Sequence, residues 1–229
     1  MSMIIFHHVP KTAGSTFHHA VVAANPDVSC MIGSEGLQSE PDRDFSRIRY
    51  LGGHIPFDDA KTSGLDQGNI HVSLLRDPIR RIVSHFEMAF RDDDVFREEI
   101  CRGDKWGLGF EVFYERFIVD EGLVNLHCKY FSKKCRFYDA VAAIVMYFQV
   151  VGIVDDFDSF RDATLAYFDE LGLKKPEAFP VQNKSGSVED CTALIDAGLL
   201  ERIKRENVED FRLYSWLKYR HEGLYVAGP

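Results

Sequence analysis

Hydrophobic and polar positions along the chain predict strands and helices that alternate. Short runs rich in β-branched and aromatic residues predict strands at Met3 to His8, Ile48 to Leu51, Asn69 to Leu75 and Gln149 to Val154. Apolar residues at helical spacing predict helices at Ser15 to Ala24, Pro78 to Phe90, Glu111 to Val119, Leu123 to Phe131, Asp139 to Phe148, Phe157 to Leu171 and Val188 to Tyr219, the last with a break near Gly198. A short element is expected around Cys30 to Ile32, and a solvated acidic loop at Asp92-Asp93-Asp94.

This order of elements indicates the α/β fold class. Strands separated by long helical crossovers predict a small parallel β-sheet flanked by helices, here with a helical C-terminal part. The length of 229 residues suits a single domain over residues 1–229. Because ligands of such sheets bind beyond the carboxyl ends of the strands, three segments are expected on one rim: Lys11 to Thr16, Gly52 to Phe57 and Arg76 to Ser84.

The turn between the first strand and the first helix is a candidate anion site. Pro10 ends the strand and is followed by Lys11, Thr12, Ala13, Gly14, Ser15 and Thr16. Such a turn presents backbone N–H groups and the positive end of the helix dipole to an anion, and the lysine and hydroxyl groups add donors. Lys11 precedes Gly14, whereas a Walker A lysine follows its glycines, so an ordinary ATPase or GTPase loop is disfavoured. The alternative is a Ser/Thr N-cap on a surface helix.

A second candidate anion site follows the strand Asn69 to Leu75. Arg76 stands at the end of that strand, where its guanidinium can fork onto a phosphate. Ser84 lies two turns into the next helix and can donate one hydrogen bond. The other polar residues of the segment are expected to be structural: Asp77 and Pro78 as the helix cap, Arg80 and Arg81 on the helix surface or in ion pairs.

Composition narrows the possible partners. The 27 Lys and Arg residues against 36 Asp and Glu residues give a formal charge of -9, which disfavours nonspecific binding to nucleic acid or anionic membranes. The 5 cysteines show no C-x-x-C spacing, so neither a zinc site nor a disulfide framework is expected, and a cytoplasmic location is the simplest inference. No apolar run approaches the roughly 20 residues of a membrane helix or resembles a signal segment, so no membrane insertion is expected.

The two candidate anion sites together resemble a known family. HVPKTAGSTF (His8 to Phe17) resembles the 5′-phosphosulfate loop of the sulfotransferases that use 3′-phosphoadenosine 5′-phosphosulfate, and LLRDPIRRIVSHF (Leu74 to Phe86) resembles their strand-helix element for the 3′-phosphate. Weaker likenesses point to the carbohydrate branch that includes heparan sulfate and uronyl 2-O-sulfotransferases. They are Gly52 to Phe57, like a Gly-His segment; Asn125 to Phe131, like an Asn-x-x-x-Arg-Tyr-Leu segment with Lys129 at the arginine place; Val151 to Phe160; Gln182 to Ser185; and Asp210 to Tyr214.

The resemblance implies a P-loop-NTPase-like sulfotransferase fold and in-line transfer of a sulfuryl group, with 3′-phosphoadenosine 5′-phosphate as product and no metal. It assigns Lys11 to the bridging oxygen of the donor and His54 to the general base, a role that suits an imidazole that titrates near neutral pH. It assigns the loop Asn183, Lys184 and Ser185 to closure over the nucleotide. The other histidines are expected to serve packing: His7 and His8 beside the loop, which compete for the base role, and His18, His19, His85, His127 and His221 on helix faces.

The acceptor is expected to be a hydroxyl of a carbohydrate or of a small molecule. Two other functions stay open at this point. A nucleotide kinase or other phosphoryl-transfer enzyme would share the strand-loop-helix cradle. Such an enzyme should show the Walker order and metal-binding carboxylates after a strand. Asp155-Asp156 is the one pair of carboxylates that follows a predicted strand. A noncatalytic nucleotide-binding protein of the same fold is the other.

Overall fold

The computed structural model describes residues 2–33, 36–37, 44–100, 105–180, 192–193 and 195–227, with the backbone alone for residues 99 and 100. Its strands form one sheet in the order β2-β3-β1-β4-β5-β6. The bounds are β1 (Ile4–His7), β2 (Ser29–Ile32), β3 (Tyr50–Gly53), β4 (Ile70–Leu75), β5 (Phe148–Ile153) and β6 (Leu224–Val226). Neighbouring strands from β2 to β5 are parallel, which confirms the predicted α/β class.

One edge of the sheet differs from the expectation. Strand β6 pairs with β5 in the antiparallel direction, so the sheet is mixed rather than wholly parallel. The strand is three residues long and follows a tight turn in which Glu222 and Gly223 both have positive φ. A run this short carries no readable alternation, because a period of two needs several residues to stand out.

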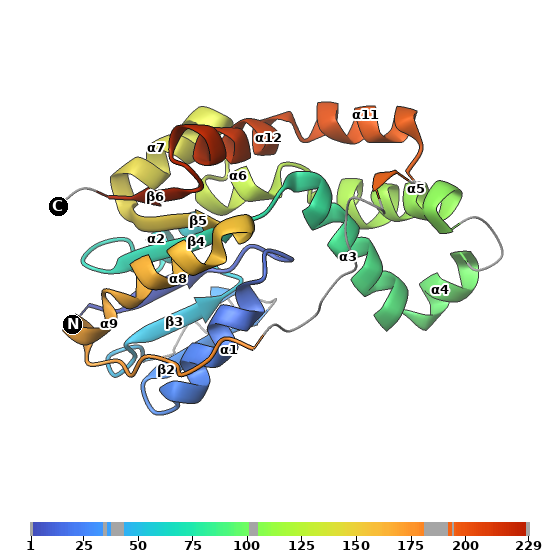
Figure 1. The fold of residues 1–229 in the computed structure, drawn as a ribbon. Coiled ribbons are helices and arrows are strands. Elements are labelled where there is room, and N and C mark those ends of the chain that lie inside the picture. Colours follow the sequence, from blue (N-terminus) through green and yellow to red (C-terminus); the bar gives the residue numbers. More distant parts are fainter. Residues whose placement is uncertain are drawn as a thin grey trace.

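Helices cover both faces of the sheet (Figure 1). On one face lie α1 (Gly14–Ala24), α8 (Phe157–Leu165) and α9 (Phe168–Leu171), and on the other lie α2 (Phe57–Thr62), α6 (Leu126–Phe131), α7 (Phe137–Tyr147) and α12 (Val208–Ser215). Phe6, Phe17 and Phe160 are fully buried on the first side, while Phe131 and Phe148 pack on the second. Burying both faces in this way accounts for the continuous apolar character of the strands.

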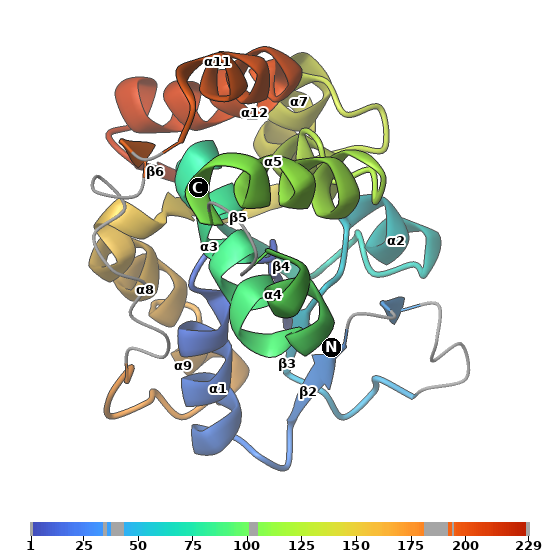
Figure 2. The ribbon, with the colours of Figure 1, turned by 90° about the vertical axis from the view of Figure 1, so that its right-hand side faces the viewer.

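A separate helical cluster lies beyond the carboxyl ends of the parallel strands (Figures 1 and 2). It consists of α3 (Pro78–Asp92), α4 (Asp94–Ile100), α5 (Phe110–Phe113), α11 (Ala197–Glu206) and the π-helical turns η2 (Lys105–Gly109) and η3 (Tyr114–Val119). Its core is aromatic, with Phe86 in edge contact with Phe110 at 5.0 Å and with Phe113 at 5.3 Å between ring centroids. Two further turns, η4 (Val154–Asp156) and η5 (Trp216–Arg220), follow β5 and α12.

The prediction of an acidic loop at Asp92-Asp93-Asp94 is wrong, because this segment forms the junction between two helices. Helix α3 ends at Asp92 and α4 begins at Asp94, and the Asp93 carboxylate accepts a hydrogen bond of 2.9 Å from the Phe96 amide. Aspartate is a strong N-cap residue, so an acidic run can start a helix as readily as it can form a loop.

The predicted break near Gly198 is present, because residues 193, 195 and 196 are non-helical and α11 begins at Ala197. Gly198 lies in the first turn of α11, where the Asp196 side chain accepts from the Leu199 amide at 3.1 Å and caps the helix. A second break, which the sequence did not predict, falls at the fully buried Asn207, between α11 and α12. Its side-chain amide donates to the Ile203 carbonyl at 2.9 Å, which satisfies a group at the end of α11. The predicted helix Phe157 to Leu171 is likewise interrupted at residues 166–167, between α8 and α9.

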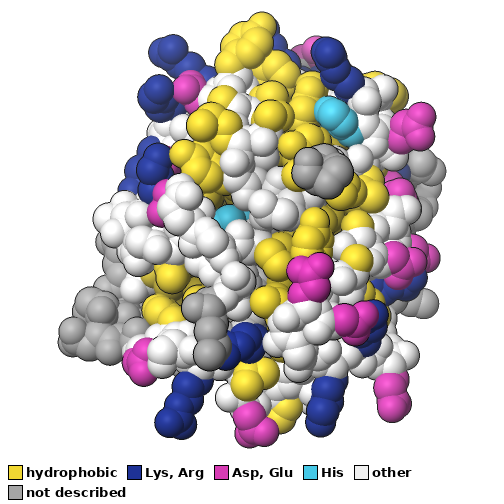
Figure 3. Space-filling view, turned by 90° about the vertical axis from the view of Figure 1, so that its left-hand side faces the viewer, with side chains coloured by type: hydrophobic (Ala, Val, Ile, Leu, Met, Phe, Trp, Pro, Cys, Tyr) yellow, Lys and Arg dark blue, Asp and Glu magenta, His cyan; other side chains and the backbone are white. Residues whose placement is uncertain are grey.

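No helix within the described ranges is long and apolar enough to cross a membrane. Figure 3 shows the side of the molecule opposite the helical cluster. Hydrophobic side chains gather across its middle, and acidic and basic side chains are interspersed around them. This face therefore presents no single sign of charge to a large charged partner.

Candidate functional site

The loop between β1 and α1 has an unusual backbone. Lys11 and Ala13 both lie in the left-handed region, with φ of 68° and 58°. Such a conformation costs a non-glycine residue roughly 1–2 kcal/mol and tends to persist at functional sites. Ala13 is the N-cap of α1 and supplies no side-chain hydrogen bond. The first turn of α1 therefore lacks the side-chain cap that the alternative interpretation of this loop requires.

The Lys11 side chain is a half-buried cation with a weak partner. Its Nζ donates to the Met88 thioether at 3.2 Å, and a thioether is a poor acceptor for an ammonium group. Burial lowers the pKa of Lys11, and the positive charges of Arg91 and Arg76 lower it further. An ammonium group in this setting favours an incoming anion, because the anion would replace lost hydration and offset the neighbouring positive charge.

Arg76 lies against the same loop. It follows the carboxyl end of β4, and its Nη1 donates to the Lys11 carbonyl at 3.3 Å. The structure therefore brings together the two cations that the sequence places in separate motifs. Ser84, the other predicted donor of the Arg76 segment, is half-buried on α3.

The hydroxyl and glycine positions of the loop serve different purposes. The Thr12 side chain is fully buried and donates to the Val9 carbonyl at 2.7 Å, so its hydroxyl is used within the loop. Thr16 is buried at the first turn of α1, and Ser15 is half-buried beside it. Gly14 has no room for a side chain, because a Cβ there would lie 2.1 Å from Cδ2 of His8.

His54 follows β3, and its ring lies against the ring of His8, which directly precedes this loop. The two imidazole rings stack with centroids 5.0 Å apart and an interplanar angle of 20°. Burial lowers the pKa of His54, and the His8 backbone carbonyl partly opposes the shift. Burial also lowers the pKa of His8 to about 3, with further contributions from His54 and Lys11. His8 thus lies between the lysine and the candidate base.

The histidine that precedes His8 points away from the rim. His7 is fully buried in the opposite face of the sheet, where Nδ1 lies 2.6 Å from the Ile55 carbonyl and Nε2 lies 2.9 Å from Nδ1 of His71. The alternation of side chains along β1 separates the two neighbours in this way. His7 therefore serves the core.

Two helical histidines differ from the expectation of helix-face positions. His18 is 3% exposed and its Nδ1 lies 3.2 Å from the Tyr50 hydroxyl, in space that Gly52 leaves open beneath it. His127 is fully buried at the start of α6, beside the carboxylate of Asp210. Both rings occupy places that the folded neighbours create, so helical spacing alone could not separate them from surface residues.

In the motif that contains Arg76, the predictions for Asp77 and Arg80 are confirmed and the prediction for Arg81 is wrong. Asp77 caps α3 as predicted, accepting from the Arg80 amide at 2.9 Å, and Arg80 forms the expected ion pair, with Asp155 at 3.3 Å. Arg81, in contrast, is fully buried rather than on the helix surface. Its Nη2 donates to the Leu123 carbonyl at 3.4 Å, and its charge lies near that of Asp210. The buried carboxylate opposes the desolvation cost of the guanidinium.

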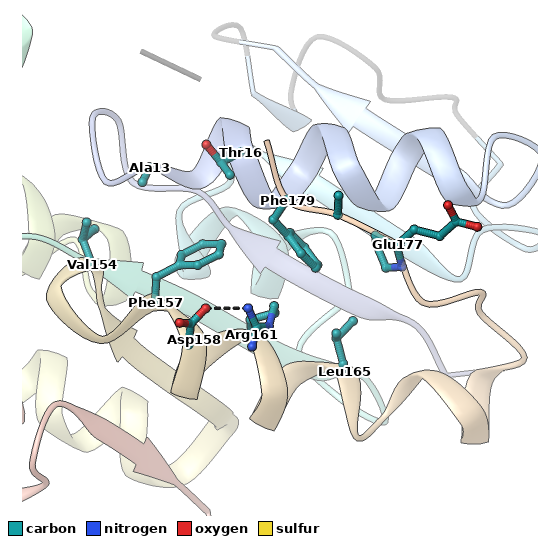
Figure 4. Close-up of a pocket in the computed structure, with 11 residues that line it drawn as sticks. Ala13, Thr16, Val154, Phe157, Asp158, Arg161, Leu165, Glu177 and Phe179 are labelled. Carbon is teal, nitrogen blue, oxygen red and sulfur yellow. Dashed lines mark hydrogen bonds and ion pairs between the residues drawn. The ribbon is translucent and has the colours of Figure 1, made fainter. Parts of the chain in front are cut away.

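A cavity of about 500 Å³ opens beside the loop, between α1 and α8 (Figure 4). Its lining consists of Ala13, Thr16, Val154, Phe157, Asp158, Arg161, Leu165, Pro176, Glu177, Ala178 and Phe179. Figure 4 shows the rings of Phe157 and Phe179 projecting into the space between the two helices. Its volume and aromatic lining suit a small organic ligand such as a nucleobase.

The predicted nucleotide-closing residues Asn183, Lys184 and Ser185 lie outside the described residues, as does Gln182. The segment that leads toward them does line the cavity, through Phe179.

Asp155, the candidate metal-binding carboxylate of the kinase alternative, accepts a hydrogen bond of 2.9 Å from the Tyr214 hydroxyl. Over the part of the chain that the structure describes, no group of three or more His, Cys, Asp or Glu side chains is arranged to hold a metal ion.

Sequence reasoning missed several members of the site. Tyr130 contacts the His54 ring, Met88 contacts Lys11, and Phe157 and Phe179 line the cavity. The position of Tyr130 beside Lys129, in the segment Asn125 to Phe131, was the one available signal. The others are ordinary apolar residues whose importance depends on what the fold places next to them.

No protein-family model matches the chain, and no curated protein matches it. Among solved structures, the chain is similar to the sulfotransferase from Alicyclobacillus acidocaldarius. The two chains share 13% sequence identity, the match covers 92% of this chain and 97% of that chain, and the TM-score is 0.43.

Proposed function

We propose that the protein is a sulfotransferase that moves a sulfuryl group from 3′-phosphoadenosine 5′-phosphosulfate to a hydroxyl of a carbohydrate or small molecule. The observation that carries the proposal is the meeting of Lys11 and Arg76 at the N-terminus of α1, where the Arg76 guanidinium donates to the Lys11 carbonyl at 3.3 Å. Two cations beside uncapped helix amides favour a ligand with more than one anionic group. The lysine-first order of the loop disfavours an ordinary nucleoside triphosphate site.

The residues present fit the donor. The loop from Lys11 to Thr16 suits the phosphosulfate end, while Arg76 and Ser84 suit the 3′-phosphate. The adjacent cavity of about 500 Å³, with Phe157 and Phe179 in its lining, suits the adenine ring. When bound, the donor supplies a sulfuryl group already attached to a phosphate leaving group. The loop Asn183, Lys184 and Ser185 stays a prediction for its closure.

Two side chains of this chain divide the chemical work. The acceptor oxygen forms a bond to sulfur as the bond from sulfur to the bridging oxygen breaks, and that oxygen leaves with the electron pair. His54 takes the proton of the acceptor hydroxyl, and the Lys11 ammonium stabilises the charge on the departing oxygen. The lowered pKa of His54 keeps its ring neutral near pH 7, so it is ready to accept a proton.

The acceptor class follows from charge. The net charge of -9 and the mixed face in Figure 3 favour a small glycan or small-molecule alcohol over a polyanionic chain. The described cysteines, Cys30, Cys128 and Cys135, are free, which supports the predicted cytoplasmic location.

The direct test incubates the protein with the radiolabelled donor and a panel of hydroxyl acceptors, and measures by calorimetry the binding of 3′-phosphoadenosine 5′-phosphate and of ATP. We expect sulfuryl transfer and preference for the bisphosphate. Lys11→Ala should lower the transfer rate at least about 100-fold, the usual effect of losing a group that stabilises transition-state charge. Lys134→Ala is the matched control, because that side chain is 73% exposed and pairs with Asp139. Preference for ATP, or absence of bisphosphate binding, contradicts the proposal.

A further inference from the structure

The His54 ring has a hydrogen-bond partner on the opposite side of the sheet from α1. Its Nδ1 lies 3.1 Å from the hydroxyl oxygen of Tyr130, which is 6% exposed on α6. Helix α6 is firmly anchored, since the buried Asp210 carboxylate accepts from the backbone amides of His127 at 3.0 Å and Cys128 at 2.9 Å. The hydroxyl is therefore presented to His54 from a rigid element.

The remaining surroundings leave one ring nitrogen of His54 available. His8 stacks on a face of the ring, and the backbone amide of His54 donates to the Ile32 carbonyl. The His54 ring meets the Tyr130 hydroxyl through Nδ1, and the backbone carbonyl of His8 also acts on the ring as a hydrogen-bond acceptor. Nδ1 faces the Tyr130 hydroxyl, which leaves Nε2 as the nitrogen to meet an acceptor hydroxyl.

A neutral imidazole carries its proton on one nitrogen, and the hydrogen bond at one nitrogen decides the state of the other. We propose that Tyr130 is a positioning residue whose hydroxyl oxygen accepts a hydrogen bond from Nδ1–H of His54, which holds Nε2 unprotonated as the proton acceptor. This inference rests on the proposed function for its catalytic meaning. The tautomer itself is a property of the protein alone.

The surrounding charges bear on how these groups titrate. His8 and His18 lie near His54, and burial keeps the pKa of each well below its ordinary value. Arg81 and Asp59 act on Tyr130 with opposite signs, and burial raises the pKa of Tyr130, so the hydroxyl stays protonated at neutral pH. A neutral hydroxyl can accept from Nδ1–H both before and after His54 takes up a proton.

The chain contains a matched control for the loss of such a contact. Tyr50, fully buried on β3, places its hydroxyl 3.2 Å from Nδ1 of His18. Tyr50→Phe therefore removes a buried tyrosine–histidine hydrogen bond of the same kind, at the His18 ring rather than at the His54 ring. A structural role alone would make Tyr50→Phe and Tyr130→Phe behave alike.

The first experiment measures the ¹⁵N shifts of the His54 ring in the full-length wild type and in both variants. We expect a protonated Nδ1 and an unprotonated Nε2 in the wild type, a mixture of tautomers in Tyr130→Phe, and no change in Tyr50→Phe. A wild-type ring protonated at Nε2 overturns the inference without need of any variant. An unaltered His54 signal in Tyr130→Phe overturns it as well.

The second experiment measures steady-state transfer. Tyr130→Phe should lower kcat about five- to tenfold, the usual worth of one hydrogen bond, with the KM for the donor unchanged. The acid limb of the pH profile should move to lower pH, because the lost hydrogen bond favoured the protonated ring. Tyr50→Phe should keep the wild-type kcat and pH profile. If Tyr130→Phe and wild type have equal kcat, the positioning role of Tyr130 is rejected and the sulfotransferase proposal stays intact. If the wild type shows no transfer, the sulfotransferase proposal is rejected, and the ¹⁵N result alone decides the tautomer.

Discussion

Acid should destabilise this protein through histidines buried in the uncharged state. His7 and His71 are both fully buried and lie 2.9 Å apart between ring nitrogens. Burial and mutual repulsion lower the pKa of His7 to about 3, and burial lowers that of His71 to about 4. In the unfolded chain both return to about 6.5. The unfolded state therefore binds more protons below pH 6.5, so the stability present above that pH is lost as the pH falls toward 4.

The magnitude follows from proton linkage. As the pH falls from 7 to 5, the proton uptake of each of these histidines on unfolding rises from about a quarter to nearly one, which removes about 2 kcal/mol of unfolding free energy per residue and about 4 kcal/mol for the pair. Small domains are stable by about 5–15 kcal/mol in total, so the pair alone removes a large share. His18 and His127, each buried with a pKa lowered to about 4, act in the same direction.

The assay is urea unfolding at pH 7, 6 and 5, followed by tryptophan fluorescence. His71→Gln removes one titrating ring, so the loss between pH 7 and pH 5 should shrink by about 2 kcal/mol relative to the wild type. Packing costs of the substitution are present at both pH values and cancel in this difference. His19→Gln, at an exposed position on α1, is the matched control. The same pH-dependent loss in His71→Gln and wild type refutes the reasoning.

Three further substitutions test the site and its support. Gly14→Ala places a methyl group against the His8 ring, and calorimetry and urea unfolding should show weaker bisphosphate binding and a stability loss of about 1–3 kcal/mol; unchanged values contradict the packing role of Gly14. Arg76→Gln should weaken bisphosphate binding about 10- to 100-fold by calorimetry, as loss of a charge-assisted contact predicts, and equal affinity removes Arg76 from the site. Asp210→Ala leaves buried Arg81 without its opposing charge and should cost about 3–5 kcal/mol in urea unfolding, whereas a loss below about 1 kcal/mol argues against this pairing.

The predicted elements and the observed ones agree where local chemistry decides the backbone. The alternating run before Arg76 forms β4, and the Asp77-Pro78 pair begins α3 as expected. The errors fall where capping side chains compete with composition, as at Asp93 and Asn207. Each of those side chains satisfies a helix end, a choice that residue averages do not record.

The candidate site was partly visible in the sequence. Lys11 and Arg76 stand at strand ends, and parallel strands bring such ends to one rim, so their meeting could be expected from pattern and topology. The role of Gly14 could not be expected from the sequence, because the His8 ring rather than a ligand fills the space beside the Gly14 Cα.

By itself the sequence determined the strand-loop-helix units, the order of lysine and glycine in the loop and the cations at two strand ends, because these depend on backbone preferences and neighbouring residues. The tertiary structure decided that Tyr130 meets His54 across a separation of 76 residues and that Arg81 is buried while Arg80 is not. Contacts of this kind depend on side chains from distant segments filling one another's space, and no local pattern encodes which of them will meet.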